Sequence, residues 1–309
     1  MFSEDPPEHY VDRPWELGLC VADDGPAEST MPPLSRILCL VSTEPSTSTA
    51  LRHAVHLACA LGAELYAVLP PERSGDVLRQ AAHEVASSEC RDALDLRVET
   101  SAPSPAASVE TLRSYVDDLE ADLAVTATPT DRGPIPPFAD PSTQAVLKGL
   151  PCSVLVAGEI APTPPRRLLL PTDLSATTRP ALDCATTLAP AYDASIDLLH
   201  VIETVPYVAL TRVDRLSLSG SSFPEHRARR RLNTFLTDAP DAPVSVEPHV
   251  AYGDPVDQIG RFVNRHAVDL MVLPARGERT PSRSSLGSTA DRVLRRVACP
   301  VLLARSGSS

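Results

Sequence analysis

The stretch "RLLLPTDLSATTRPALDCATTLAPAYDASIDLLHV" at residues 167–201 decides the fold class. It begins with an apolar run, continues with a helical pattern and ends in a second apolar run, "IDLLHV". Buried strands of a parallel sheet read as continuous apolar runs of this kind. The stretch is therefore predicted to form a strand, a helix and a second strand of an α/β domain.

A related stretch, "RILCLVSTEPSTSTALRHAVHLACALGAELYAVL" at residues 36–69, aligns with the first at a shift of 131 residues. The sequence from Ser108, "SVETLRSYVDDLEADLAVTATP", aligns with "PVDQIGRFVNRHAVDLMVLPAR" from Pro255 at a shift of 147. "PCSVLVA" from Pro151 then matches "ACPVLLA" from Ala298. Self-similarity of this kind indicates that the chain contains two copies of one domain, and that the middle of the second copy is longer than that of the first.

The predicted organisation is a tail, a first domain, a linker and a second domain, at residues 1–33, 34–158, 159–165 and 166–305. The tail holds eight acidic side chains against one arginine, a net charge of −7, and six prolines. This composition predicts a disordered or loosely draped segment. The linker, "EIAPTPP", is short and stiffened by proline.

Strands and helices are predicted to alternate within each copy. In the second copy the expected strands are Leu168–Leu170, Ile196–Val201, Val244–Val250, Leu270–Leu273 and Val301–Leu303. Apolar residues at helical spacing predict a helix in each copy, through Val109, Leu112, Val116 and Leu119 and through Val256, Ile259, Val263 and Ala267. The fold class is therefore α/β: two open sheets of five mainly parallel strands, with helices on both faces and right-handed crossovers.

Composition excludes several classes of protein. No apolar run is long enough to span a membrane, and a net charge of −12 argues against a nucleic-acid partner. The N-terminus lacks a secretory signal, and the seven scattered cysteines form no CxxC pair, so we expect a cytoplasmic protein with unpaired, packing cysteines. Lys148 is the one lysine, which fits either a salt-adapted, halophilic proteome or a GC-rich genome.

The sequence offers no catalytic or metal motif. It has neither the Gly-x-Ser-x-Gly turn of serine hydrolases nor a GxxxxGK[ST] loop. His53 and His56 lie on a predicted helix without a third metal ligand. The run "RARRR" at residues 227–231 lies in a predicted helix that would bury Leu232 and Phe235, so the arginines are interpreted as a solvated face, with a site for an anionic partner as the alternative.

Open parallel sheets bind ligands beyond the carboxyl ends of their strands. After the first strand of the second copy, "PTDLS" places Asp173 where its carboxylate faces a ligand, caps the next helix or forms an Asx turn. After the fourth strand, "LPARGERTPSRSSLGST" at residues 273–289 is either a phosphate-holding loop or an ordinary surface turn. Its Gly287 and Ser288 open a predicted helix, whose N-terminus can bind an anion, although Ser288 is also a good N-cap residue.

These motifs, with "LLHV" at 198–201, "GDP" at 253–255 and "VLRRVACPVLL" at 293–303, resemble the universal stress protein family in its tandem two-domain form. The resemblance covers nearly all of the chain after residue 33 and implies a fold like that of the adenine nucleotide alpha hydrolases. It also implies ATP binding, with magnesium, through a Gly-x2-Gly-x9-Gly-Ser/Thr motif. The implied nucleotide-binding residues are Pro171, Thr172, Asp173, Val201, Leu273, Pro274, Gly277, Gly287, Ser288 and Thr289.

One departure affects the second copy and several affect the first. Pro274 occupies the first glycine position, so its ring either crowds the nucleotide or replaces one backbone contact. Arg276 and Arg279 either pair with phosphate oxygens or are solvated loop cations. The first copy replaces the motif residues by Ser42, Ala127, Thr130, Asp140 and Pro141, so it is expected to bind no nucleotide.

In the family resembled, two such domains pair through their last strands. We therefore expect Val154–Val156 to meet Val301–Leu303 across a pseudo-two-fold axis, which makes one chain an intramolecular dimer; a further homodimer stays open. The implied function is that of a regulatory stress-response protein rather than an enzyme. The alternatives are a nucleotide-free adaptor that docks an unknown protein partner, and a slow ATPase or autokinase.

Overall fold

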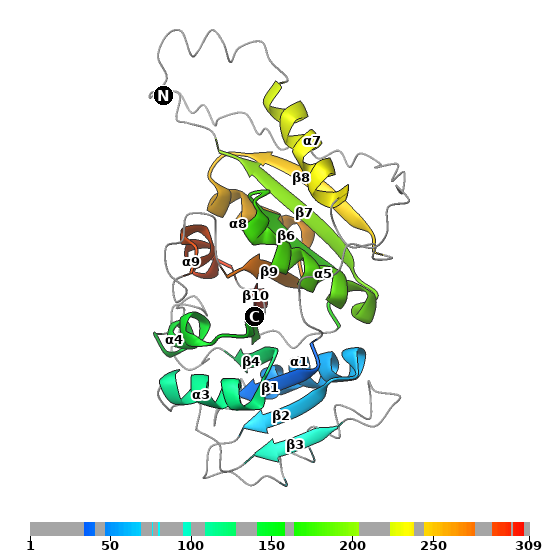
Figure 1. The fold of residues 1–309 in the computed structure, drawn as a ribbon. Helices are drawn as coiled ribbons and strands as arrows, with labels where there is room; N and C mark the ends of the chain where they lie inside the picture. The colour runs from blue at the N-terminus through cyan, green and yellow to red at the C-terminus, as the bar shows by residue number, and fades with distance from the viewer. Residues whose placement is uncertain are drawn as a thin grey trace, which may run out of the picture.

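The computed structural model describes residues 34–40, 47–68, 76, 80, 95–99, 109–127, 141–157, 164–203, 223–237, 244–275, 286–297 and 299–305. One sheet of ten strands runs through the molecule in the order β3-β2-β1-β4-β5-β10-β9-β6-β7-β8 (Figure 1). The strands of the first half are β1 (Arg36–Leu40), β2 (Glu64–Val68), β3 (Leu96–Glu99), β4 (Leu123–Ala127) and β5 (Ser153–Ala157). Those of the second half are β6 (Arg167–Thr172), β7 (Ser195–Ile202), β8 (Val246–Tyr252), β9 (Leu270–Pro274) and β10 (Val301–Ala304).

Both halves of the sheet repeat one strand order. The order 3-2-1-4-5 of the first half recurs as β8-β7-β6-β9-β10 in the second, and every pair within a half is parallel. The predicted α/β class with a mainly parallel, open sheet is confirmed. The predicted strand at 244–250 begins at Val246 and continues to Tyr252, because it pairs with β7 up to Ile202.

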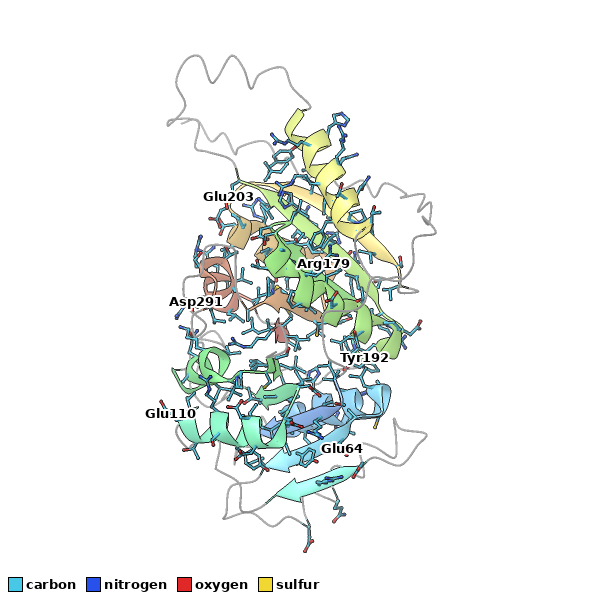
Figure 2. All side chains as sticks on the ribbon, in the orientation of Figure 1. Glu64, Glu110, Arg179, Tyr192, Glu203 and Asp291 are labelled. Carbon is cyan, nitrogen blue, oxygen red and sulfur yellow. The ribbon has the colours of Figure 1, made fainter. Side chains whose placement is uncertain are left out.

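Helices cover both faces of the sheet (Figure 1). One apolar core includes residues of α1 (Thr47–Leu61), α5 (Arg179–Tyr192) and α7 (Phe223–Thr237). The core on the other face includes residues of α3 (Val109–Leu119), α4 (Pro141–Gly149), α8 (Pro255–His266) and α9 (Ser288–Leu294). Figure 2 shows Arg179 on α5 and Asp291 on α9, which belong to these two separate layers.

The predicted apolar face of α8 is correct except at its end. Val256, Ile259 and Val263 are buried, but Ala267 is exposed and has a left-handed φ of 49°. The helix ends at His266, and Phe262 completes the buried face instead. Helical spacing extends past a helix end because the pattern carries no information on where the backbone turns.

The two halves join through the antiparallel pair β5 and β10. Leu302 lies opposite Leu155, and both are almost fully buried. Arg305 reinforces this seam, since its guanidinium donates to the carbonyl oxygen of Leu147 at 2.6 Å and its backbone N–H donates to Ser153 Oγ at 3.1 Å. The prediction that these two terminal strands meet is confirmed by their register.

The cysteine prediction is confirmed only in part. Cys39, Cys152, Cys184 and Cys299 are free, and burial raises the pKa of each thiol to about 12. Cys59 is disulfide-bonded, contrary to the expectation of unpaired thiols. Pairing depends on the distance between two side chains in space, which the spacing of cysteines along the chain does not show.

Candidate functional site

The candidate site lies where the strand order of the second half reverses. β6 has β7 on one side and β9 on the other, so the connection from β6 to β7 and the later connection from β8 to β9 run in opposite directions across the sheet. Its ladder with β9 ends at Leu169 opposite Met271, although both strands continue beyond this pair. The region beyond the carboxyl ends of the strands, where the strand order reverses, is the usual ligand position in such a sheet.

Asp173 follows β6 and is exposed at this edge. Its Oδ1 accepts a hydrogen bond from the backbone N–H of Ser175 at 3.0 Å, and others from the hydroxyls of Ser175 and Thr178 at 2.6 and 3.0 Å. The Asx-turn alternative is therefore correct for this oxygen. Within the described residues Oδ2 accepts no hydrogen bond, so the carboxylate can hold the turn and still face a ligand.

Thr172 supports the same turn from inside. It is buried, and its Oγ1 accepts the backbone N–H of Leu174 at 2.9 Å. Leu174 has a left-handed φ of 61°, which a branched residue adopts only when its surroundings hold it there. Pro171 is buried too, so neither Pro171 nor Thr172 presents an exposed side chain at the edge.

Val201 lies near the end of β7 and is half-buried. Its neighbour His200 was missed by the sequence analysis, although it is a polar residue in the quoted stretch "LLHV". His200 Nδ1 lies 2.9 Å from the carbonyl oxygen of Thr172. Burial lowers the pKa of His200; the Thr172 carbonyl opposes this effect, and the charge of Arg231 adds to it.

Pro274 is the last residue of β9 and is half-buried, whereas Leu273 is buried. The next residue, Ala275, donates its N–H to the carbonyl oxygen of Ala304 on β10 at 2.9 Å. Because backbone groups alternate in direction along a strand, the nitrogen of Pro274 points the other way, toward β6. The ladder between β6 and β9 has already ended there, so the missing N–H removes no sheet hydrogen bond.

The N-terminus of α9 lies next to the end of β9. Gly287 is its N-cap residue and donates its N–H to the carbonyl oxygen of Ala275 at 3.3 Å. No side chain caps the helix among the residues that the structure describes, so the interpretation of Ser288 as the N-cap is wrong. Ser288 and Thr289 are exposed in the first turn, where unpaired N–H groups can bind an anion.

Ion pairs hold α9 from both sides. Arg292 donates to Asp254 at 3.1 Å, and Asp254 also caps α8 by accepting from the backbone N–H of Val256 at 2.9 Å. Burial alone would raise the pKa of Asp254, but these hydrogen bonds outweigh it and lower the pKa. Asp291 lies 3.3 Å from Lys148 on α4, so a residue of the first half also positions α9.

In the sequence, "GDP" at 253–255 contributes only to the family resemblance. The structure gives it a part in positioning the site. Gly253 has a φ of 131°, a conformation that side-chain-bearing residues rarely adopt, and Asp254 links α8 to α9.

Several predicted site residues lie outside the described ranges. They are Gly277, Arg276 and Arg279 in the second half and Ser42, Thr130 and Asp140 in the first. The same holds for the acidic tail at 1–33 and for most of the linker. In the first half, Ala127 ends β4 and Pro141 begins α4.

A cluster of polar residues lies at the opposite, amino-terminal end of the strands. Asp197 accepts from Arg167 at 2.5 and 3.0 Å, and its Oδ1 lies 2.9 Å from His249 Nε2. Glu247 is near enough for these side chains to surround a metal ion. Because the Arg167 guanidinium already binds both oxygens of Asp197, a cation would have to displace it, and the cluster is better explained as a buried ion pair.

Comparison with known proteins places the second half in a family. Residues 165–305 match the model of the Universal stress protein family. A universal stress protein of Methanocaldococcus jannaschii is 26% identical over 140 residues, which cover 45% of this chain and 82% of that protein.

Solved structures extend the likeness in fold to most of the chain. A functionally unknown protein from Pseudomonas aeruginosa PAO1 has a TM-score of 0.66 at 17% identity, covering 89% of this chain and 93% of that one. A universal stress protein from Archaeoglobus fulgidus has a TM-score of 0.54 at 14% identity, covering 88% and 97%. In the described part of the chain, none of the helices has the length and apolar character needed to cross a membrane.

The match to the family model shows that residues 165–305 form a domain of the universal stress protein family.

Proposed function

We propose that the second half binds ATP, with magnesium, and that the protein acts as a nucleotide-dependent regulator in a stress response. One observation carries this proposal. Asp173 and the N-terminus of α9 lie beyond the carboxyl ends of β6 and β9, which are adjacent strands whose pairing ends before this edge. A carboxylate for sugar hydroxyls and free helical N–H groups for phosphates thereby lie at one edge of the sheet.

In this arrangement each residue has a distinct role. Asp173 Oδ2 accepts a hydrogen bond from the ribose, and the backbone of Val201 binds the adenine. Ser288 and Thr289 bind phosphate oxygens through their N–H groups and hydroxyls. Pro171, Thr172, Leu273 and Pro274 form the wall of the pocket, and Gly277 and Gly287 let the backbone approach the phosphates.

We further propose that residues 34–158 and 166–305 are two domains related by a pseudo-two-fold axis, and that the first binds no nucleotide. Asp140 would place a negative charge at the phosphate position, which repels the ligand. The first domain instead serves as a fixed partner that positions α9 through Lys148 and Asp291. We assign no catalytic residue to this site.

Isothermal titration calorimetry with ATP, at high salt and with magnesium, tests the proposal. We expect saturable binding of one ATP per chain. Gly287→Val should abolish it by blocking the approach of phosphate, whereas Ser42→Ala in the first half should leave it unchanged. Absence of heat, together with absence of co-purified nucleotide, would rule out ATP binding.

The second candidate is a nucleotide-free adaptor that docks a protein partner. Two observations favour it: Oδ1 of Asp173 is already satisfied within its own turn, and Pro274 replaces the first motif glycine. Affinity capture with the full chain, in the presence and absence of ATP, separates the two functions. A partner captured equally well under both conditions favours the adaptor.

A further inference from the structure

The exposed side of α7 carries a cluster of arginine and histidine side chains. It consists of His226, Arg227, Arg230 and Arg231, all exposed, and we call it the α7 cationic face. Leu232 and Phe235 are buried on the opposite side of the helix. The helix contains four arginines and one glutamate, in a chain whose net charge is −12.

In the part of the chain that the structure describes, the arginines of this face lack carboxylate partners, unlike several arginines elsewhere. Within the described residues, Arg227, Arg230 and Arg231 form no ion pair with a carboxylate, whereas Arg36 pairs with Glu120 at 2.7 Å. Arg227 and Arg231 are one helical turn apart, where like charges repel and destabilise the helix. An anionic partner on this face would remove that repulsion.

The chain contains a segment of matching charge. Residues 1–33 carry eight acidic side chains and one arginine, a net charge of −7. The charge of this acidic segment is therefore opposite to that of α7, the most basic of the described helices. Electrostatic complementarity of this kind brings the two surfaces together and sets their orientation.

The length of the segment is sufficient for it to reach α7. Because β5 and β10 are antiparallel, the amino end of β1 and the carboxyl end of β7 lie along the same edge of the ten-stranded sheet. These two strands are six positions apart in the sheet, or about 30 Å at the usual strand spacing. A chain of 33 residues can extend over roughly 110 Å.

One end of α7 also lies at the edge of the sheet that holds the carboxyl end of β7. α7 follows β7 in the chain, and Figure 1 shows one end of α7 extending past the ends of β7 and β8. The guanidinium of Arg179, at the start of α5, lies 5.1 Å from the ring centroid of Phe235, so it is the amino-terminal half of α7 that projects. This half bears the cationic face.

We propose that the acidic segment 1–33 docks on the α7 cationic face of the same chain. Docking in cis is effective even when the intrinsic contact is weak, because the connecting chain keeps the segment at a high local concentration. The contact is electrostatic and weakens as salt screens it.

Limited proteolysis of the full chain tests this docking. A glutamate-specific protease cleaves the segment after Glu4, Glu8, Glu16 and Glu28, and docking protects these bonds. The variant R227Q/R230Q/R231Q should be cleaved at least about threefold faster than the unmodified protein at low ionic strength. The difference should vanish at 1 M salt, where the Debye length is only about 3 Å.

A matched variant controls for the loss of charge. R52Q/R113Q/R261Q neutralises three exposed arginines on α1, α3 and α8, and it should be cleaved at the unmodified rate. Equal cleavage of the α7 variant and this control would overturn the proposal. Protection that increases with protein concentration would overturn it too, because it would place the segment on a second copy of the chain.

A second measurement does not depend on altering α7. Replacing the eight acidic residues of the segment by their amides should make Arg227, Arg230 and Arg231 react faster with phenylglyoxal, as followed by mass spectrometry. Arg52 provides the internal reference, since its rate should not change. Unchanged rates at all four arginines would contradict docking on this face.

Discussion

Asp173 Oδ1 accepts the backbone N–H of Ser175 at 3.0 Å, so the side chain that we propose to bind ribose also shapes its own loop. Asp173→Ala should therefore lower the free energy of unfolding by about 0.5–2 kcal/mol, comparable to the loss of a helix cap. Asp173→Asn keeps a side-chain oxygen and should retain most of this stability. Urea denaturation checks both variants, and an equal loss in the two would contradict the turn as the cause.

Pro274 stands at the candidate site where the usual nucleotide-binding motif has its first glycine. Pro274→Gly should raise the affinity for ATP severalfold, because it removes a ring from the candidate site and supplies an N–H directed toward β6. The same change should lower the free energy of unfolding by about 0.4–1 kcal/mol through the added freedom of the unfolded chain. Calorimetry and urea denaturation measure the two effects, and an unchanged affinity would show that the ring does not contact the nucleotide.

Asp197 should contribute far more to stability than an exposed ion pair does. Asp197→Asn weakens buried hydrogen bonds to Arg167 and His249 and should lower the free energy of unfolding by about 1.5–3 kcal/mol. Asp193→Asn is the matched control, since Asp193 pairs with Arg166 at 2.8 Å but is 96% exposed. Its effect should stay below about 1 kcal/mol.

The contribution of Asp197 should also depend on pH. Burial alone would raise its pKa, but hydrogen bonds from His249 and Arg167 outweigh this and lower the pKa from the ordinary value of 3.8. The stability that it supplies is therefore complete above this value and is lost as the pH falls through the lowered pKa. Urea denaturation at pH 7 and pH 3 should show the gap between the unmodified protein and Asp197→Asn narrowing in acid.

His53 should destabilise the fold on mild acidification. It is buried on α1, and burial lowers its pKa from 6.5 to about 4. Between pH 6.5 and 4 the His53 imidazole is protonated in the unfolded chain but neutral in the folded chain. The free energy of unfolding should therefore fall by up to about 3 kcal/mol as the pH drops from 6.5 to 4. His53→Leu should reduce this slope to the part that His56 and His200 supply, since burial lowers the pKa of both, whereas His226→Gln, at an exposed position, should retain the full slope.

Sequence patterns predicted much of the fold. Two copies of one pattern were enough to predict parallel strands with helices on both faces, because apolar periodicity follows directly from which side of an element is buried. The pairing of Val154–Val156 with Val301–Leu303 was also predicted, through the resemblance to paired domains. The end of α8 was not predicted, because Ala267 continues the helical spacing of apolar residues although the helix has already ended at His266.

The sequence by itself determined that Asp173 and Gly287 follow the first and fourth strands of the second copy, and hence that both lie at one edge of a parallel sheet. Only the tertiary structure decided that Asp173 is engaged in its own turn and that Arg292 reaches Asp254 across 38 residues of chain. It also decided that Asp197 meets His249 across 52 residues. The reason is physical: periodicity records burial along one element, whereas a polar contact between elements depends on strand order, register and helix placement, which arise only when the whole chain packs.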